Sequence, residues 1–575
     1  HIKKLNNYYY VGYNLRYHPG VRTRSRGISD CVTYSCKKTN MIEAKIKYGD
    51  KADSAILAEV HQMVEKDVWR YLTPKESQDK LSSGEKIIPS SIFLKEKFDA
   101  FNNFEKLKAR LVACGNFQDT EDGENKFESP TASLTVTLMA LETAAREKMV
   151  IKAADVGGAY LNGILDTKQL MSLQKSVSNI LVENNPKLNK YVNKRGTITV
   201  QLQKGLYGLR EASRIWYNTI STLLINNGYV CSQWDKCLFV KEENGMKTII
   251  VLYVDDMLIC GSNCKLVDDV IAILREAFHE ITVKEGDKIS FLGLEIVRYS
   301  ENNSIKVSQG NYILKLIEEY EVTGNDKLPA NDSLHLYEER NTENQCDKDE
   351  YVSLVMKIMY AAVRTRPDIL YVTNVLASKC KEPSKLDMKN AIRILRYLNG
   401  TKDDGLLYLS DKAWRLHMSV DASFNQHADA KGHSGYVIFA SEGSAGILFK
   451  STKQKTVADS STEAELIALH DGVKHLLWVS SIYAELGYNT AEAIQVDQDN
   501  KACIIISSDA PVNFKGRSKF INRKYFSVYE HVKNGKLALV YIGTNDMIAD
   551  FLTKVQTMDK HRKFKIIIMG NNLSY

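Results

Sequence analysis

The hydrophobic pattern of the chain is organised around one stretch, Thr248 to Gly261, with the sequence TIIVLYVDDMLICG. An almost wholly apolar, β-branched run is followed by two carboxylates, Asp255 and Asp256, and a second apolar run starts at once. That pattern predicts a buried β-hairpin with two acids at its tip. Because adjacent carboxylates repel each other beside an apolar core, the hairpin favours a shared divalent metal ion. A solvated turn is the alternative, since Asp-Asp also occurs at 268–269 and 403–404.

Helical periodicity predicts further elements on both sides of this hairpin. One helix runs from about Lys51 to Tyr71, a second follows Pro130, and a helical region that Pro367 interrupts or restarts runs from Tyr351 to Gly400. Their apolar stripes are expected to face the core. The predicted stripes are Ile56, Val60 and Val64; Leu134, Leu138, Leu141 and Ala145; Val352, Val355, Met356 and Met359; and Ala391, Leu395 and Leu398.

A third acid, Asp155, ends a short apolar strand predicted in IKAADVGGAYLNG. Gly157 and Gly158 would let the backbone come close to a ligand, and Tyr160 could present its ring to a sugar. An ordinary turn aspartate is the alternative. The Asp255 hairpin disfavours it, because metal-dependent phosphoryl chemistry needs carboxylates from separate strands.

Basic and apolar residues alternate along the predicted strand KLKARLVACGNFQD, which places Lys106, Lys108 and Arg110 on one face. Three cations on one strand face can hold the oxygens of a triphosphate, arginine being suited to bidentate contacts. A solvated edge strand shows the same alternation, and both interpretations stay open.

From about Trp414 the pattern changes to that of an independent α/β domain. Apolar strands lead into a helix over SSTEAELIALHDGVKHLLW, which starts with a capping box of Ser460 and Glu463 and is followed by two more strands. A two-metal nuclease needs several acids, since it must activate water and stabilise the leaving 3′-oxygen of a phosphodiester. Acids at strand ends and helix starts occur in the order Asp421, Glu465, Asp499 and Asp550.

Composition changes this picture little. The length of 575 residues allows about three or four compact units, and the net charge of +7 fits a polyanionic partner without proving one. The 10 cysteines include no CxxC pair or Cys/His cluster, so no structural zinc site is expected. No apolar run approaches the roughly 20 residues that span a bilayer, which predicts a soluble, intracellular protein that binds no membrane. The start at His1 favours a segment of a longer chain.

Four motifs occur in a fixed order: Asp155 with VGGAY, LYGL at Leu206, YVDD at Tyr253 and FLGLEI at Phe291. With KARLVA, they resemble the polymerase of the copia-type (Pseudoviridae) LTR retrotransposon Pol polyprotein, and the resemblance covers most of the chain. It implies an α+β multidomain fold, in which a right-hand polymerase (fingers, palm, thumb/connection) is followed by an α/β ribonuclease H-like domain with a mixed sheet. The implied domains are an N-terminal connector at 1–45, fingers and palm at 46–330, thumb/connection helices at 331–410 and the ribonuclease H domain at 411–575.

The resemblance also implies roles for individual residues. One aspartate triad would hold the polymerase metals, the KARLVA strand would face the triphosphate, a tyrosine would discriminate against a ribose 2′-hydroxyl, and the FLG strand would grip the primer end. The residues so assigned are Asp155, Asp255 and Asp256 for catalysis and metal; Lys108, Arg110 and Tyr160 for the nucleotide; and Phe291, Leu292 and Gly293 for the primer grip.

The four C-terminal acids resemble the Asp-Glu-Asp-Asp set of ribonuclease H, which is both catalytic and metal-binding. Two choices have neighbouring competitors. Glu463 competes with Glu465, which is preferred because the following ELIAL resembles the family's helix. Asp497 competes with Asp499, which is preferred because Asp499-Asn500 precedes a helix.

The implied function is an RNA-directed (and DNA-directed) DNA polymerase with ribonuclease H activity, which copies retrotransposon RNA by two-metal phosphoryl transfer. The expected cofactor is Mg²⁺, two ions per active site, with Mn²⁺ as the alternative. Expected partners are an RNA template, a DNA primer, the RNA/DNA hybrid, deoxynucleoside triphosphates and the integrase segment of the same polyprotein. The expected location is the cytoplasm, in a virus-like particle, with the nucleus as the alternative.

The chain departs from its relatives at three places. Glu211 replaces a frequent Gln after LYGLR, Phe520 stands where relatives have His, and Val555-Gln556 replaces Pro-Leu. Two rival interpretations therefore remain. One is a degenerate nucleic-acid-binding remnant without turnover, and the other is a nuclease with an inactive polymerase.

Overall fold

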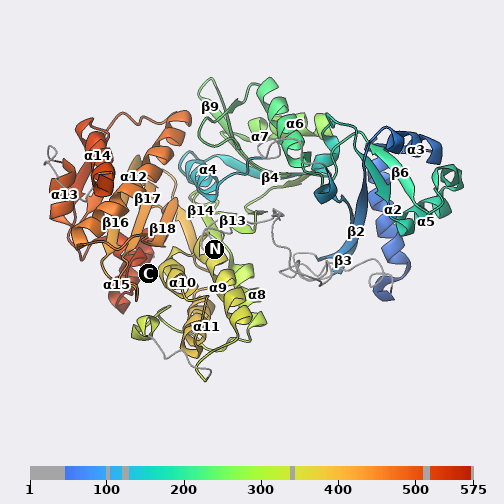
Figure 1. Ribbon diagram of the computed structural model, residues 1–575. Helices are drawn as coiled ribbons and strands as arrows, with labels where there is room; N and C mark the ends of the chain where they lie inside the picture. The colour runs from blue at the N-terminus through green and yellow to red at the C-terminus, as the bar shows by residue number, and fades with distance from the viewer. Residues whose placement is uncertain (1–45, 99–103, 119–128, 337–342, 509–518, 571–575) are drawn as a thin grey trace. The chain divides into compact units, whose positions relative to one another are not determined.

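The computed structural model describes residues 46–98, 104–118, 129–336, 343–508 and 519–570 (Figure 1). The predicted connector at 1–45 lies outside the described residues. The chain divides into two compact units. Unit 1 comprises His1–Ser129 and Gly158–Leu223, and unit 2 comprises Pro130–Gly157 and Leu224–Tyr575.

Unit 1 is built on a five-stranded sheet with helices around it. The strands, in sheet order, are β1 (Trp69–Leu72), β6 (Ile198–Leu202), β5 (Leu170–Leu173), β2 (Ile87–Phe98) and β3 (Phe104–Ala113). The helices are α2 (Asp50–Glu65), α3 (Pro74–Ser82), α5 (Lys175–Asn184) and the first part of α6 (Ala212–Asn226). Side chains along β3 alternate as predicted, with Ala109, Leu111 and Ala113 buried.

The helix predicted from Lys51 to Tyr71 ends earlier, at Glu65. Asp67 turns the chain with a φ of 50°, and Trp69 then opens β1, which pairs with β6. The apolar run at the helix end therefore continues into a strand. Periodicity alone missed the change, because β1 is only 4 residues long.

Unit 2 contains a six-stranded sheet that carries the predicted hairpin. Its strands, in sheet order, are β11 (Ile281–Lys284), β4 (Val150–Val156), β10 (Asp256–Gly261), β9 (Met246–Tyr253), β8 (Leu238–Glu243) and β7 (Val230–Cys231). The predicted hairpin of β9 and β10 is confirmed, and an Asn244-Gly245 turn connects β8 with β9. Helices α4 (Leu134–Arg146) and α7 (Cys264–Phe278) pack against this sheet.

A four-stranded sheet and a group of helices follow in unit 2. The strands are β12 (Lys288–Phe291), β13 (Leu294–Arg298), β14 (Ile305–Ser308) and β15 (Gly405–Tyr408), and the helices are α8 (Gly310–Glu319), α9 (Lys348–Ala362), α10 (Leu370–Ala377) and α11 (Lys385–Gly400). The stripe of α11 is buried as predicted. On α9 the prediction is wrong for Met356, which is 38% exposed, because the buried face of the helix carries Leu354 and Ile358 instead.

The C-terminal part of unit 2 has a mixed sheet, as the family resemblance implies. Its strands, in sheet order, are β18 (Leu448–Lys453), β17 (His433–Ser441), β16 (Trp414–Ser423), β19 (Ile494–Gln498) and β20 (Leu537–Tyr541). Strand β16 is antiparallel to β17 and parallel to β19, and the long helix α12 (Ser461–Glu485) covers β16 and β17 (Figure 1). The remaining elements are α13 (Lys501–Ser508), α14 (Lys519–Lys533), the 3-10 turn η8 (Ile548–Leu552) and α15 (Met558–Met569). None of the described helices combines the length and apolarity that a bilayer crossing requires.

A buried ion pair connects the start of α10 with α11. Arg366 Nε and Nη2 donate to the two carboxylate oxygens of Asp368 at 2.9 and 2.7 Å, and both side chains are fully buried. The hydroxyl of Tyr397 donates to the same carboxylate at 2.6 Å. Burial opposes ionisation of Asp368, but the Arg366 guanidinium prevails and holds the pKa of that carboxyl well below its usual value.

Replacement Asp368→Asn should destabilise the protein strongly, because it leaves the Arg366 charge buried without its counter-ion. We expect a loss of about 3–5 kcal/mol in the free energy of unfolding, measured by urea denaturation. The matched control is Asp326→Asn, whose partner Arg393 lies 3.5 Å away with both side chains partly exposed. That change should cost about 1 kcal/mol or less. Equal losses in the two variants would contradict the importance of the buried pair.

Candidate active site

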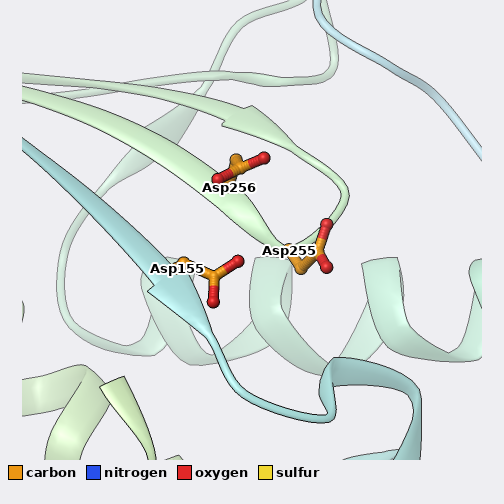
Figure 2. A group of neighbouring side chains, drawn as sticks. All are labelled: Asp155, Asp255 and Asp256. Atoms are coloured by element: carbon orange, nitrogen blue, oxygen red, sulfur yellow. The ribbon is translucent and has the colours of Figure 1, made fainter. Parts of the chain in front are cut away.

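Three carboxylates meet at the end of the six-stranded sheet. Asp155 lies near the end of β4, Asp255 lies in the hairpin turn, and Asp256 opens β10 directly opposite Asp155 in the register. One carboxylate oxygen from each lies within 4.8 Å of the others. Figure 2 shows the three side chains gathered beside the strand ends. The structure thus brings together all three acids predicted for this site, which we call the first cluster.

The hairpin turn holds Asp255 in place through the backbone. Tyr253 pairs with Asp256, so that the turn consists of Val254 and Asp255. Val254 has a φ of 59°, a left-handed conformation that a β-branched residue rarely adopts. The Asp255 carbonyl accepts a hydrogen bond of 3.0 Å from Val156 N on the neighbouring strand. A strained turn is thereby fixed to β4, as is common at functional sites.

The first cluster concentrates negative charge in a half-buried place. Burial, together with the charges of Asp255 and Asp155, raises the pKa of Asp256 to about 6, while Lys284 on β11 opposes this shift. Three carboxylates with hard oxygen donors at this spacing fit a divalent ion such as Mg²⁺ or Mn²⁺. The donor set therefore agrees with the predicted metal.

The two glycines after Asp155 have a structural role that the sequence did not reveal. A Cβ on Gly157 would lie 2.8 Å from the Glu280 carboxylate, and Gly157 N donates to the Glu280 carbonyl at 2.8 Å. Gly158 has a φ of 62°, which favours glycine. The group that comes close to the Gly157 backbone is therefore Glu280 of the same unit.

A second cluster lies in the C-terminal sheet. Asp421 on β16, Asp499 just beyond β19 and Asp550 in η8 have carboxylate oxygens within 4.8 Å of one another. Burial raises the pKa of Asp421 to about 6, an effect that Lys554 opposes and Asp550 and Asp499 increase. These donors again fit a divalent ion.

Glu465 lies beside the second cluster on α12. Burial raises the pKa of its carboxyl well above the usual value, and the charges of Asp421 and Asp499 add to the effect. Gln498 Nε2 lies 3.4 Å from the Glu465 carboxylate. The Glu465 side chain is thus close enough for the charges of Asp421 and Asp499 to shift its pKa. It lies outside the group of three acids whose carboxylate oxygens are within 4.8 Å of one another.

The two competing acids are engaged elsewhere. Asp497 accepts hydrogen bonds from Ser419 Oγ at 2.8 Å and Gln495 Nε2 at 2.7 Å within the sheet. Ser460 caps α12: its Oγ accepts from Glu463 N at 3.2 Å, and the Glu463 carboxylate accepts from Asp459 N at 2.7 Å. The predicted capping box is therefore only half formed, because the carboxylate bonds to the residue before Ser460.

Sequence reasoning missed Lys554, whose Nζ lies 2.6 Å from Asp550 Oδ1 and 3.4 Å from Asp421 Oδ2. Lys554 follows Asp550 by four residues, a spacing that by itself gives no signal of the contact. Thr553 at the same place donates its hydroxyl to the Asp421 carboxylate. Thr553 and Lys554 thus both contact the second cluster.

The predicted nucleotide residues lie in unit 1. Arg110 approaches the buried Glu59 carboxylate at 3.7 Å and stacks over the Tyr207 ring at 4.7 Å. Tyr160 makes an edge contact with the same ring, with centroids 4.8 Å apart. Tyr207 therefore joins two of the predicted residues, whereas the side chain of Lys106 lies outside the described residues. The nucleotide roles of Lys108, Arg110 and Tyr160 stay predictions.

The loop containing LYGL packs closely on the end of β3. Gly208 has a φ of 91°, and a Cβ there would lie 2.1 Å from the Ala113 carbonyl oxygen. Glu211, which departs from the family pattern, is buried and accepts a hydrogen bond of 3.0 Å from Gln118 Nε2. The substituted carboxylate therefore has a partner within unit 1.

The segment predicted as a primer-gripping strand is instead the tip of a hairpin between β12 and β13. Phe291 is buried and pairs with Leu294, while Leu292 and Gly293 form the turn with φ values of 51° and 76°. The Leu292 carbonyl accepts from Arg364 Nη1 at 2.7 Å. A two-residue turn with two positive φ angles explains the glycine, and contact with a primer stays a prediction.

Comparison with known proteins gives one family match and a set of relatives. Residues 78–330 match the family described as "Reverse transcriptase (RNA-dependent DNA polymerase)". The chain is 28% identical to the "Retrovirus-related Pol polyprotein from transposon RE1" of Arabidopsis thaliana over 87% of this chain and 32% of that protein. It is 31% identical to the corresponding RE2 polyprotein over 80% of this chain and 30% of the relative.

A tobacco relative from Nicotiana tabacum, the "Retrovirus-related Pol polyprotein from transposon TNT 1-94", is 29% identical over 85% of this chain and 36% of its own length. The chain thus spans about a third of the curated relatives it matches. Among solved structures, a foamy viral protease-reverse transcriptase in complex with double-stranded DNA has a TM-score of 0.49 at 13% identity, covering 86% of this chain and 70% of that one. Residues 78–330 therefore match a reverse transcriptase family, and the chain is similar to copia-type retrotransposon Pol polyproteins over most of its length, as its motifs predicted.

Proposed function

We propose that the chain is an RNA-directed and DNA-directed DNA polymerase with ribonuclease H activity, which copies the RNA of a retrotransposon. The observation that supports this most is the gathering of Asp155, Asp255 and Asp256 at one strand end inside a reverse transcriptase domain. The second acid cluster supports a separate phosphodiester-cleaving site. RNA template, DNA primer, their hybrid and deoxynucleoside triphosphates are the proposed ligands.

In the proposed polymerase site, the first cluster holds the reacting groups. Divalent ions bound there would activate the primer 3′-hydroxyl and neutralise the leaving pyrophosphate. Asp155 and Asp256 stand on adjacent strands, and Asp255 is fixed by its bond to Val156, so the three acids keep a rigid spacing. Lys108 and Arg110 bind the triphosphate, and Tyr160 excludes the ribose 2′-hydroxyl. Phe291, Leu292 and Gly293 hold the primer end.

In the proposed nuclease site, Asp421, Glu465, Asp499 and Asp550 hold the ions that activate water against the RNA strand. The parallel pairing of β16 with β19 places Asp421 and Asp499 at neighbouring strand ends. A hybrid near A-form offers a broad minor groove with 2′-hydroxyls on one strand only, so shape and sugar contacts select it without sequence reading. Binding should weaken steeply with salt, because lysine and arginine contacts to phosphates release counter-ions.

The two activities should be separable by single substitutions. Asp255→Asn should lower primer extension on poly-rA with oligo-dT and Mg²⁺ by about 100-fold or more, because a metal centre supplies several kcal/mol. Cleavage of the RNA strand in a preformed hybrid should persist in that variant. Asp550→Asn should show the reverse pattern.

The matched control for the first cluster is Asp269→Asn, because Asp269 belongs to a second Asp-Asp pair and is exposed on α7. It should retain both activities. A native chain that binds the hybrid but extends and cleaves nothing would favour the remnant interpretation. Cleavage without extension would favour a nuclease with an inactive polymerase.

Metal binding at the first cluster should depend on pH. The Asp256 carboxyl, with its pKa raised to about 6, is protonated below that pH, and a divalent ion must then displace the proton. Mn²⁺ affinity should therefore fall about tenfold as the pH drops from about 7 to about 5. Isothermal titration of the full chain measures this, the first-cluster contribution being the binding that Asp255→Asn removes. An affinity that stays constant over this range would contradict the assignment.

A further inference from the structure

One lysine contacts two of the acids of the second cluster. Lys554 Nζ lies 2.6 Å from Asp550 Oδ1 and 3.4 Å from Asp421 Oδ2. The two aspartates are 3% and 1% exposed, so their charges have little access to water. Among the ion pairs of the described residues, Lys554 is the cation that reaches this cluster. Its ammonium therefore balances acids that would otherwise be buried without compensation.

The backbone that carries Lys554 is fixed independently of the ammonium. Lys554 N donates to the Asp550 carbonyl at 3.0 Å, and Gln556 Nε2 donates to the same carbonyl at 2.8 Å. Thr553 donates its hydroxyl to Asp421. Gln556 belongs to the pair that replaces Pro-Leu in relatives, so the altered segment keeps a contact that closes the loop.

The ammonium of Lys554 can move away from the second cluster into solvent. The side chain is 37% exposed, in contrast to the two buried aspartates. A long, flexible side chain can turn its ammonium into water while its backbone remains in place. The loop contacts of Thr553 and Gln556 would then persist after the ion pair opens.

A divalent ion held by Asp421 and Asp550 must lie close to the oxygens that Lys554 now contacts. Two cations at that spacing repel each other, and the carboxylate oxygens that bind one are less available to the other. Binding of the ion and retention of the lysine contacts therefore compete.

We propose that Lys554 is a built-in counter-ion of the second cluster, which neutralises Asp421 and Asp550 while no divalent ion is bound and gives up its contacts when one binds. The lysine lowers the metal affinity of the site and keeps its acids assembled in the metal-free chain. This inference rests on the proposed function in one respect, that the second cluster binds a divalent ion. Lys554 is thus a positioning residue, and it need not touch the substrate.

The counter-ion role predicts that removal of the Lys554 charge has two opposite effects. Lys554→Met keeps much of the side-chain stem and removes the charge. Mn²⁺ affinity at the second cluster should rise by about tenfold, because the competing charge is gone. The metal-free protein should unfold at a lower temperature, and added Mn²⁺ should raise that temperature more than it does in the native chain.

The experiment uses the full chain with Asp255→Asn, so that binding at the first cluster is suppressed, and Mn²⁺ as the probe in isothermal titration. Second-cluster binding is the part that a further Asp550→Asn removes. Lys554→Arg keeps the charge and should stay near the native affinity. The matched control is Lys563→Met, since Lys563 pairs with the exposed Asp546 at 2.5 Å in the same domain. Lys554→Gln provides a second neutral variant should Lys554→Met not fold.

The outcomes separate the inference from the function on which it rests. Higher Mn²⁺ affinity in Lys554→Met, with unchanged affinity in Lys563→Met, supports the counter-ion role. Unchanged or weaker binding in Lys554→Met overturns that role, while the nuclease site stands. If Asp550→Asn removes no binding from either the native lysine form or Lys554→Met, the proposed metal site fails, and the counter-ion role fails with it.

Discussion

The constraint on which this chain depends is the electrostatic cost of gathering carboxylates at the ends of buried strands. Asp155, Asp255 and Asp256 meet where β4 and the β9–β10 hairpin end, and the strands behind them are almost wholly apolar. Mutual repulsion and poor solvation oppose such an arrangement. It persists because backbone pairing, rather than the side chains themselves, fixes the positions. The register of β4 with β10 sets the spacing of two acids before any ligand is present.

In the second cluster, the electrostatic cost of gathering carboxylates is offset in a different way. Its acids are more deeply buried than those of the first cluster, and Lys554 lies among them. In the first cluster, Lys284 on β11 opposes the raised pKa of Asp256 only as the last of several effects. The two sites therefore have similar carboxylate donors, but a nearby lysine balances more of the negative charge in the second cluster than in the first.

Much of this could be predicted from sequence where the signal is local. The hairpin, its acids and the α/β character of the C-terminal domain follow from the sequence pattern, since periodicity and turn residues are short-range properties, whereas the mixed C-terminal sheet came from the family resemblance. The long-range contacts could not be predicted. Helix α4 is buried on nearly every side, and its Glu142 accepts hydrogen bonds from Ser441 and Tyr483 at 2.9 Å. Those partners lie 299 and 341 positions away in the sequence, where no periodicity connects them.

Packing also decided the details that pattern reading missed. Met356 is exposed because α9 buries the face that carries Leu354 and Ile358, and the contact of Gly157 is with Glu280 of its own unit. Lys554 escaped notice because a lone lysine carries no signal until the fold brings Asp421 beside Asp550. Residues whose function depends on a distant partner thus become visible only in three dimensions.

The central claim is that both acid clusters hold divalent cations. Anomalous X-ray scattering from crystals of the full chain soaked in Mn²⁺ tests it most directly. We expect peaks at coordination distance from Asp155, Asp255 and Asp256 and from Asp421, Asp499 and Asp550. Ordered side chains at both clusters without an anomalous peak, or peaks confined to other acids, would contradict the account.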